Sequence, residues 1–273
     1  MCNKKVNKPH FFKYDRAQET GQVMKERIEE SIKKGPLPAK LDFFQSASGL
    51  ILGLFMWGHM LLVSSILLGK DTMYKVAKSL EGSFLTSDGH GFPILVTFAA
   101  VGISVIFILH ALVAIRKFPM NWKQFRIYRS HMNTIKHPDS NLWFTQVVTA
   151  FIMFFLGSIH LFVIMTHPSQ IGPYASSDRI VSDWMWPLYL VLLFAVELHG
   201  TIGLYRLCVK WGWFEGKNSR VTRKRLKNLK RFLTVFFLVL GLATLGAYVK
   251  IGYEHRDHAG ERYTPQTSRT INH

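Results

Sequence analysis

Residues 91–115 read GFPILVTFAAVGISVIFILHALVAI, and this stretch, which carries no charged side chain, decides the fold. A membrane-spanning α-helix needs about 20 consecutive apolar residues, so the stretch is long enough to cross a bilayer. Four more stretches share this character, apart from one acid, Glu197: residues 47–68, 140–166, 184–205 and 232–249. Five such helices would leave a soluble domain too little polar surface. The sequence therefore predicts an all-α integral membrane bundle of five transmembrane helices.

We expect three parts along the chain. A polar cytoplasmic tail occupies residues 1–40, a transmembrane domain residues 41–253, and a tail outside the membrane residues 254–273. Residues 14–34 favour a short helix with charges all round it, which suits either a solvated tail or docking to a cytoplasmic subunit. The first span exceeds the apolar core of a signal peptide and lacks a cleavage site, so we expect it to stay in the mature chain. The predicted spans are about 42–68, 92–116, 142–166, 182–210 and 229–250.

The basic residues are divided unequally between the two sides of the predicted bundle. Of the 34 Lys and Arg residues, 26 fall in the first tail and in residues 116–141 and 206–231, and 8 fall on the opposite side. Because cytoplasmic loops of membrane proteins are enriched in Lys and Arg, we predict a cytoplasmic amino terminus and a carboxyl terminus outside. The same distribution explains the net charge of +17 without a nucleic-acid partner. The basic loops would face anionic lipid headgroups and a cytoplasmic partner.

Four histidines lie inside predicted spans, one in each of the first four: His59, His110, His160 and His199. A single intramembrane histidine also suits a helix–helix hydrogen bond or a proton relay. The depth of each histidine in the membrane tests whether two of them share one level, as two ligands of one haem must. At about 1.5 Å of rise per residue, His59 and His160 lie about 26 and 27 Å above the inner ends of their helices. His110 and His199 lie about 22 to 26 Å below the outer ends, a level about 10 to 15 Å further in. This arrangement predicts two bis-histidine b haems, one above the other.

Cysteine content restricts the cofactors that this chain can bind by itself. The chain has only Cys2 and Cys208 and no C-x-x-C-H motif. A cysteine-ligated iron–sulfur cluster and covalent haem attachment are therefore excluded. Any haem in this chain is held non-covalently.

Polar and basic side chains lie near the predicted inner haem. Arg206 and Lys210 fall within about 20° of His199 on one helix face. Gln45 lies about 21 Å below the level of the outer pair, and Trp143 lies at the inner end of its helix. We expect these groups to reach the haem propionates, while Arg206 and Lys210 equally suit the membrane interface as snorkelling cations.

Glu197 is the only acid within any predicted span. Intramembrane carboxyl groups commonly mark functional sites. Glu197 lies about 200° around the helix from His199, so it cannot be the hydrogen-bond partner of that imidazole. We expect either a protonated hydrogen-bonding group or a proton-relay station.

Several strings within residues 40–253 resemble the dihaem cytochrome b subunit of fumarate reductase: QSASG at 45–49, WGHM at 57–60, LHA at 109–111, RKFP at 116–119, GSIHL at 157–161, LFAVELHG at 193–200 and KWGWF at 210–214. The resemblance implies a complex of three chains in the bacterial inner membrane: an FAD flavoprotein that reduces fumarate, an iron–sulfur subunit, and this anchor, which would oxidise menaquinol. It also implies that His59 and His160 bind the outer haem iron and that His110 and His199 bind the inner one.

The resemblance further implies roles for single residues. Glu81 matches the base of the quinol site, and Glu197 matches a carboxylate that transfers protons. The residues matched to haem propionates are Gln45, Ser46, Trp143 and Lys210 for the inner haem and Arg179 for the outer haem. Two alternatives stay open. The same architecture can run in reverse as a succinate:quinone reductase anchor, and a haem-free proton-coupled transporter would use the histidines and Glu197 as a proton path.

Overall fold

A computed structural model describes residues 35–87, 89, 91–119, 121–135 and 138–265. Within these residues the chain is helical and contains no β-strand. Five of the described helices are long and apolar enough to cross a membrane, which confirms the predicted fold class. The helix expected within residues 14–34 lies outside the described residues.

The spanning helices are α2 (Leu37–Val63, continued by the 3₁₀ turn η1, Ser64–Leu68), α4 (Ile94–Ile115), α6 (Pro138–Thr166), α8 (Trp186–Lys210) and α9 (Ser219–Glu254). Shorter elements lie between and after them: α3 (Lys70–Leu80), η2 (Ser83–Leu85), α5 (Trp122–Ile135), α7 (Pro173–Val181) and η3 (Arg256–His258). The sequence pattern did not indicate α3, α5 or α7, because these short helices are polar and have no long apolar run.

The last spanning helix, α9, begins ten residues before the predicted span. Its first turn is capped by Asn218, whose side-chain oxygen accepts hydrogen bonds from the backbone N–H groups of Arg220 (3.1 Å) and Val221 (3.3 Å). Asn is among the preferred residues at this position. The charge-free stretch therefore marks the part of α9 that can lie in hydrocarbon, whereas the cap marks where the helix begins.

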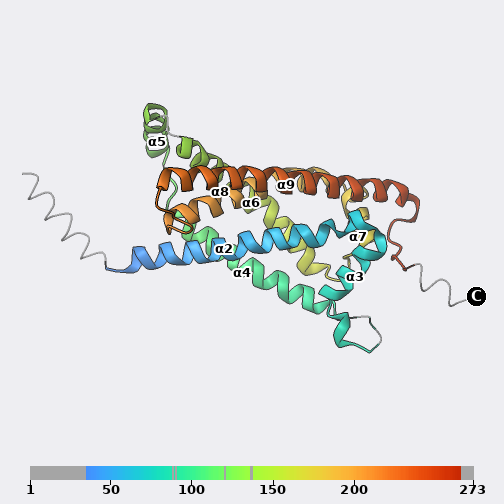
Figure 1. Ribbon diagram of the computed structural model, residues 1–273. Helices are drawn as coiled ribbons and strands as arrows, with labels where there is room; N and C mark the ends of the chain where they lie inside the picture. The colour runs from blue at the N-terminus through green and yellow to red at the C-terminus, as the bar shows by residue number, and fades with distance from the viewer. Residues whose placement is uncertain (1–34, 88, 90, 120, 136–137, 266–273) are drawn as a thin grey trace, which may run out of the picture. The chain divides into compact units, whose positions relative to one another are not determined.

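By its contacts the chain divides into two units, residues 1–44 and 45–273. Of the first, the structure describes residues 35–44, which include the first turns of α2. In the second, α4 packs on α6, α6 on α8, and α8 on α9, and these helices lie side by side (Figure 1). Helices α3 and α7 lie at one end of this bundle, the α7 end, and α5 lies at the other, the α5 end (Figure 1).

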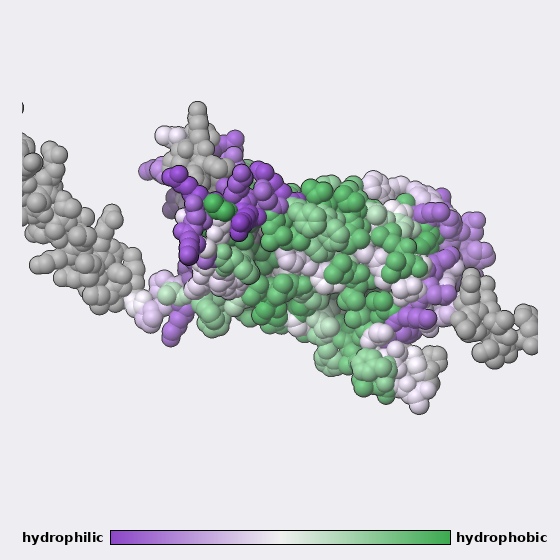
Figure 2. Space-filling model, in the orientation of Figure 1, coloured by the Kyte–Doolittle hydropathy of each residue, from purple (hydrophilic) through white to green (hydrophobic). Residues whose placement is uncertain are grey.

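The surface of the bundle between its two ends is apolar. Figure 2 shows hydrophobic residues gathered along the middle of the visible face and hydrophilic residues toward both ends. Large side chains are exposed there, among them Phe98 (66%), Leu112 (62%) and Phe155 (64%). A soluble monomer rarely exposes a contiguous apolar surface of this extent, whereas lipid covers it at no cost. The chain is therefore a multi-pass membrane protein.

Candidate functional site

The structure brings together the two histidines that were predicted to share the outer level. The ring centres of His59 (α2) and His160 (α6) are 6.1 Å apart, with 57° between the ring planes. The His59 ring stacks on Phe55 one turn earlier in its helix. On the other side, His160 Nδ1 lies 3.4 Å from the hydroxyl of Tyr189 on α8.

The other two histidines also form a pair. The ring centres of His110 (α4) and His199 (α8) are 6.5 Å apart, and their planes are nearly perpendicular, at 88°. His110 Nδ1 lies 3.0 Å from Ser48 Oγ. His199 Nδ1 donates to the carbonyl oxygen of Gln146 on α6 at 3.0 Å, and Thr149 Oγ1 lies 3.4 Å from the same nitrogen.

The two pairs lie at different depths in the bundle. The His199 ring contacts Thr149, and His160 follows Thr149 by 11 residues along α6. At 1.5 Å per residue, that is about 16 Å of helix. His160 lies toward the α7 end, because its neighbour Tyr189 packs into the same apolar cluster as Ile180 of α7.

The geometry of each pair fits a haem iron. A metal–imidazole nitrogen bond is about 2 Å long, and the nitrogen lies about 1.1 Å from its ring centre, so two imidazoles on one iron have centres about 6.2 Å apart. The observed 6.1 and 6.5 Å agree with this separation. Three of the four rings use Nδ1 for a polar contact, which leaves Nε2 available to a metal, a pattern typical of metal-binding histidines. Among the described residues no group of three or more His, Cys, Asp or Glu could hold a metal ion. The two histidine pairs, by their separation, are the candidate iron ligands.

Side chains predicted near the inner propionates make contacts between helices close to the residues that meet the His110–His199 pair. Lys210 Nζ donates to Ser46 Oγ at 3.3 Å, and an Arg206 N–H donates to Gln146 Oε1 at 2.7 Å. The buried Gln45 Oε1 has no hydrogen-bond partner within the part of the chain that the structure describes. A buried amide oxygen without a partner is costly, so this residue fits a place beside a polar ligand group.

The remaining two predicted propionate residues have other contacts. Trp143 stacks on Tyr128 of α5, with ring centres 4.8 Å apart and 24° between the planes. Arg179 on α7 is 7% exposed and donates to the carbonyl oxygen of Gln170 at 2.5 Å. Trp143 therefore also attaches α5 to α6, and Arg179 also holds the turn that leads into α7.

Glu81 lies at the α7 end, directly after α3. It is 2% exposed, and Lys78 Nζ lies 2.7 Å from its Oε2. The Glu81 carbonyl oxygen also accepts a hydrogen bond from the backbone N–H of Phe92 at 2.6 Å, which ties the loop to the start of α4. The carboxylate is thus held by one cation and shielded from bulk water.

Glu197 is buried in α8, with 1% of its surface exposed. Neither carboxyl oxygen has a hydrogen-bond partner among the described residues. One turn later, Thr201 Oγ1 accepts from Thr234 Oγ1 of α9 at 2.9 Å. Because positions four apart share a helix face, Glu197 lies on the face of α8 that meets α9, away from the His199 side.

The hydrogen-bond partners of the imidazoles were not predicted from the sequence. They are Ser48, Gln146, Thr149 and Tyr189. Polar side chains within otherwise apolar spans were the available signal, since such groups need partners in hydrocarbon. The signal did not identify which imidazole each one would reach, because every contact joins two different helices.

Comparison with known proteins identifies relatives of this chain. The family described as Succinate dehydrogenase/Fumarate reductase transmembrane subunit matches residues 123–242. The fumarate reductase cytochrome b subunit of Wolinella succinogenes is 55% identical over 225 residues, which cover 82% of this chain and 87% of that protein. The subunit of the same name from Helicobacter pylori J99 is 52% identical over 229 residues, 84% of this chain and 88% of that protein.

Five membrane-spanning helices, two facing pairs of histidines, and relatives that match over most of both chains lead to one family. This chain belongs to the succinate dehydrogenase/fumarate reductase transmembrane subunits, among the fumarate reductase cytochrome b subunits.

Proposed function

We propose that this chain oxidises menaquinol at the outer face of a bacterial inner membrane and conducts the electrons across it to cytoplasmic subunits that reduce fumarate. The observation that carries the proposal is the pairing of four histidine rings at 6.1 and 6.5 Å, at two depths of one bundle. In this proposal the α7 end lies outside and the α5 end faces the cytoplasm, in agreement with the distribution of Lys and Arg.

Each of the four histidines would donate an imidazole nitrogen to a haem iron. His59 and His160 would hold the outer haem b, and His110 and His199 the inner one. A bound haem b supplies one-electron redox chemistry at its iron. The polar contacts at Nδ1 of His110, His160 and His199 would fix the orientation of these three rings.

Haem propionates need cations or hydrogen-bond donors when they are not in water. Lys210, Ser46, Arg206 and Gln45 would serve the inner haem. Arg206 contacts Gln146, whose carbonyl oxygen accepts from His199. Lys210 contacts Ser46, two residues before the Ser48 that meets His110. Trp143 would contribute its indole N–H from the same end of α6. At the other end, Arg179 would serve the outer haem.

Glu81 would act as the base of the quinol site. Menaquinol must lose two protons and two electrons to become menaquinone, and a carboxylate within hydrogen-bond reach of a quinol hydroxyl can accept the proton. Lys78 Nζ lies 2.7 Å from this carboxylate and holds it in place. Glu197 would transfer protons within the membrane, where a chain of apolar residues offers them no path.

Fumarate reduction belongs to the partner subunits. This chain has too few cysteines for an iron–sulfur cluster of its own. An iron–sulfur subunit and an FAD flavoprotein would therefore bind at the basic cytoplasmic end and receive the electrons. The reverse direction, with succinate as the electron donor, would use the same residues. The names of the relatives favour fumarate reduction.

The proposal is tested on the complex purified in mild detergent with its partner subunits. We expect fumarate-dependent oxidation of a soluble naphthoquinol and, separately, fumarate reduction with reduced viologen dyes. Glu81→Gln should abolish the first activity and leave the second intact. The described residues that follow α9, 255–265, are called the carboxyl-terminal segment. Glu261→Gln, at an exposed acid of this segment, is the matched control and should leave both activities unchanged. Naphthoquinol oxidation that survives Glu81→Gln would reject the assigned base, and a complex without any haem would reject the proposal as a whole.

A further inference from the structure

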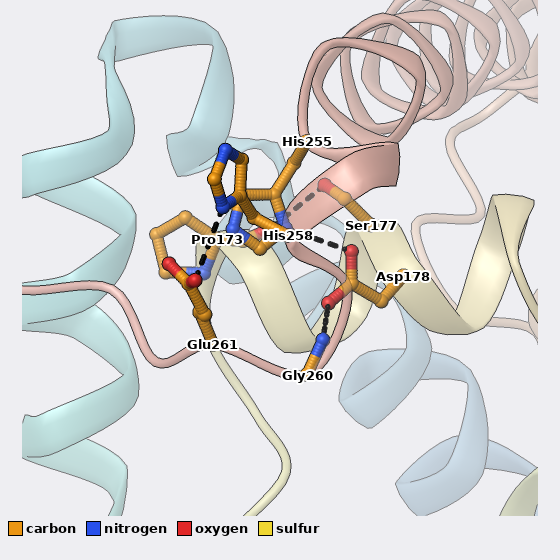
Figure 3. A network of polar contacts seen from close by, with 7 residues as sticks. All are labelled: Pro173, Ser177, Asp178, His255, His258, Gly260 and Glu261. Atoms are coloured by element: carbon orange, nitrogen blue, oxygen red, sulfur yellow. Dashed lines mark hydrogen bonds and ion pairs between the residues drawn. The ribbon is translucent and has the colours of Figure 1, made fainter.

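A carboxylate of α7 binds the carboxyl-terminal segment at two points (Figure 3). Asp178 Oδ1 lies 3.1 Å from Nδ1 of His255, the residue that ends α9, and Asp178 Oδ2 accepts the backbone N–H of Gly260 at 2.9 Å. Asp178 is 9% exposed and His255 is 7% exposed. We call these three residues the Asp178 latch. Hydrogen bonds to a charged and buried group are the strong ones, so the latch fixes this segment against α7.

Aromatic contacts extend the latch to α3. The His255 ring stacks on Tyr174 of α7, with centres 3.8 Å apart and 18° between the planes. Tyr174 in turn meets Tyr263 edge to face at 5.1 Å. The Tyr263 hydroxyl donates to Asp71 Oδ1 of α3 at 2.6 Å. The carboxyl-terminal segment therefore joins α3, α7 and α9.

Helix α7 is also pressed closely against α9. A Cβ atom added at Gly252 of α9 would lie 2.7 Å from the carbonyl oxygen of Ser177, and Ser177 is 0% exposed. No side chain fits between the two backbones at this point. The latch and this close packing therefore both hold α7 against the end of α9.

The position of α7 reaches the outer histidine pair through two contacts. Ile180 belongs to a buried apolar cluster against which Tyr189 of α8 packs. The Tyr189 hydroxyl lies 3.4 Å from His160 Nδ1, and the two rings meet edge to face. The latch, α7, Tyr189 and His160 thus form one continuous series of packed groups.

We propose that Asp178 is a positioning residue for the outer haem site: the latch fixes α7, which fixes Tyr189 and hence the ring orientation of His160. The inference rests on the proposed haem ligation. It assigns a function to the carboxyl-terminal segment, which contains none of the predicted site residues. Loss of the Asp178 carboxylate leaves the buried His255 Nδ1 and the Gly260 N–H without this acceptor, so the segment separates from α7 and the His160 ring is free to turn.

The test compares three variants of the full complex: Asp178→Ala, Asp178→Asn and the matched control Glu261→Gln. Asn keeps an oxygen for Gly260 but loses the charge that faces His255, so its effect should be intermediate. Glu261 contacts His258 at 3.1 Å on the exposed surface of the same segment, so its loss should change nothing.

Two measurements are made on each variant. Hydrogen exchange of the α7 amides should become faster by more than about tenfold in Asp178→Ala, since the lost bonds involve a charged group. The EPR spectrum of the oxidised haems reports the angle between the two imidazole planes, which is 57° in the outer pair and 88° in the inner pair. The signal that His59→Ala removes belongs to the outer haem; it should shift in Asp178→Ala, while the inner signal stays in place.

Three results would overturn the inference. Exchange in α7 that stays slow would show that the latch does not fix this helix. Faster exchange with an unchanged outer signal would show that the latch holds the segment without affecting His160. Equal shifts of both signals would indicate general damage to the bundle. If Asp178→Ala does not assemble, the same readouts on Asp178→Asn decide. Absence of two haem signals in the unmodified complex would instead refute the proposed function.

Discussion

Gly49 gives the sharpest prediction about the inner haem site. A Cβ atom at this position would lie 2.9 Å from Cε1 of the His110 ring, a distance at which one of the two groups must move. The ring cannot retreat easily, because His110 Nδ1 is held by Ser48 Oγ at 3.0 Å. Gly49→Ala should therefore displace the imidazole from its ligating position.

The expected size follows from the cost of overpacking. An extra methyl group in a closely packed site costs about 1 to 3 kcal/mol, which corresponds to an affinity about 5- to 150-fold weaker. Gly102→Ala is the matched control. It lies on α4, eight residues before His110, and no atom lies within 4 Å of an added Cβ. In both helices alanine is the better helix former, so only the contact with His110 separates the two variants.

The assay measures haem retention during dilution in detergent. The absorbance of the oxidised and of the reduced protein reports how much of each haem remains. Gly49→Ala should lose the inner haem to about 5- to 150-fold lower concentrations of a haem-free haem-binding competitor protein, as the cost of about 1 to 3 kcal/mol implies. It should keep the outer haem. Gly102→Ala should behave like the unmodified chain. Equal retention by both variants, or equal loss of the two haems in Gly49→Ala, would refute the reasoning.

Two further predictions concern buried polar groups. Glu197→Gln keeps the shape of the side chain but removes its titratable proton. Both haems should remain, while naphthoquinol-driven fumarate reduction falls about 100-fold or more, the range for general acid–base groups; unchanged turnover would contradict a proton-transfer role. Thr244→Val removes a hydrogen bond of 2.9 Å to Ser64 between α9 and η1, and should destabilise the bundle by about 0.6 kcal/mol, as measured by reversible unfolding in mixed micelles. Thr145→Val, which removes a bond within α6, is its control and should have a smaller effect.

The number of spans was predictable because charge is so costly in hydrocarbon that its absence marks a membrane helix. The pairing of His59 with His160 was predictable for a related reason: straight helices of known rise convert sequence separation into depth. The amino-terminal turns of α9 were not predicted, since residues 219–228 are polar and only the Asn218 cap identifies them as helical.

Contacts between distant residues were beyond the sequence pattern. Asp178 and His255 are 77 positions apart. Neither lies in a stretch whose apolar pattern would predict which part of the chain it contacts. Tyr189 is 29 positions from His160, and the hydroxyl of a tyrosine in a membrane helix can meet any of several neighbouring helices. Trp143 was expected to serve a haem, but its stacking on Tyr128 depends on α5, a helix that the charge pattern did not indicate.

The most direct test of the account is the haem content of the purified chain and of its four histidine variants. Quantitative haem extraction with a reduced-minus-oxidised spectrum should give two b haems per chain. His59→Ala and His160→Ala should each lose the same haem, and His110→Ala and His199→Ala should each lose the other. One haem per chain, no b-type bands, or a loss pattern that pairs His59 with His110 would contradict the account.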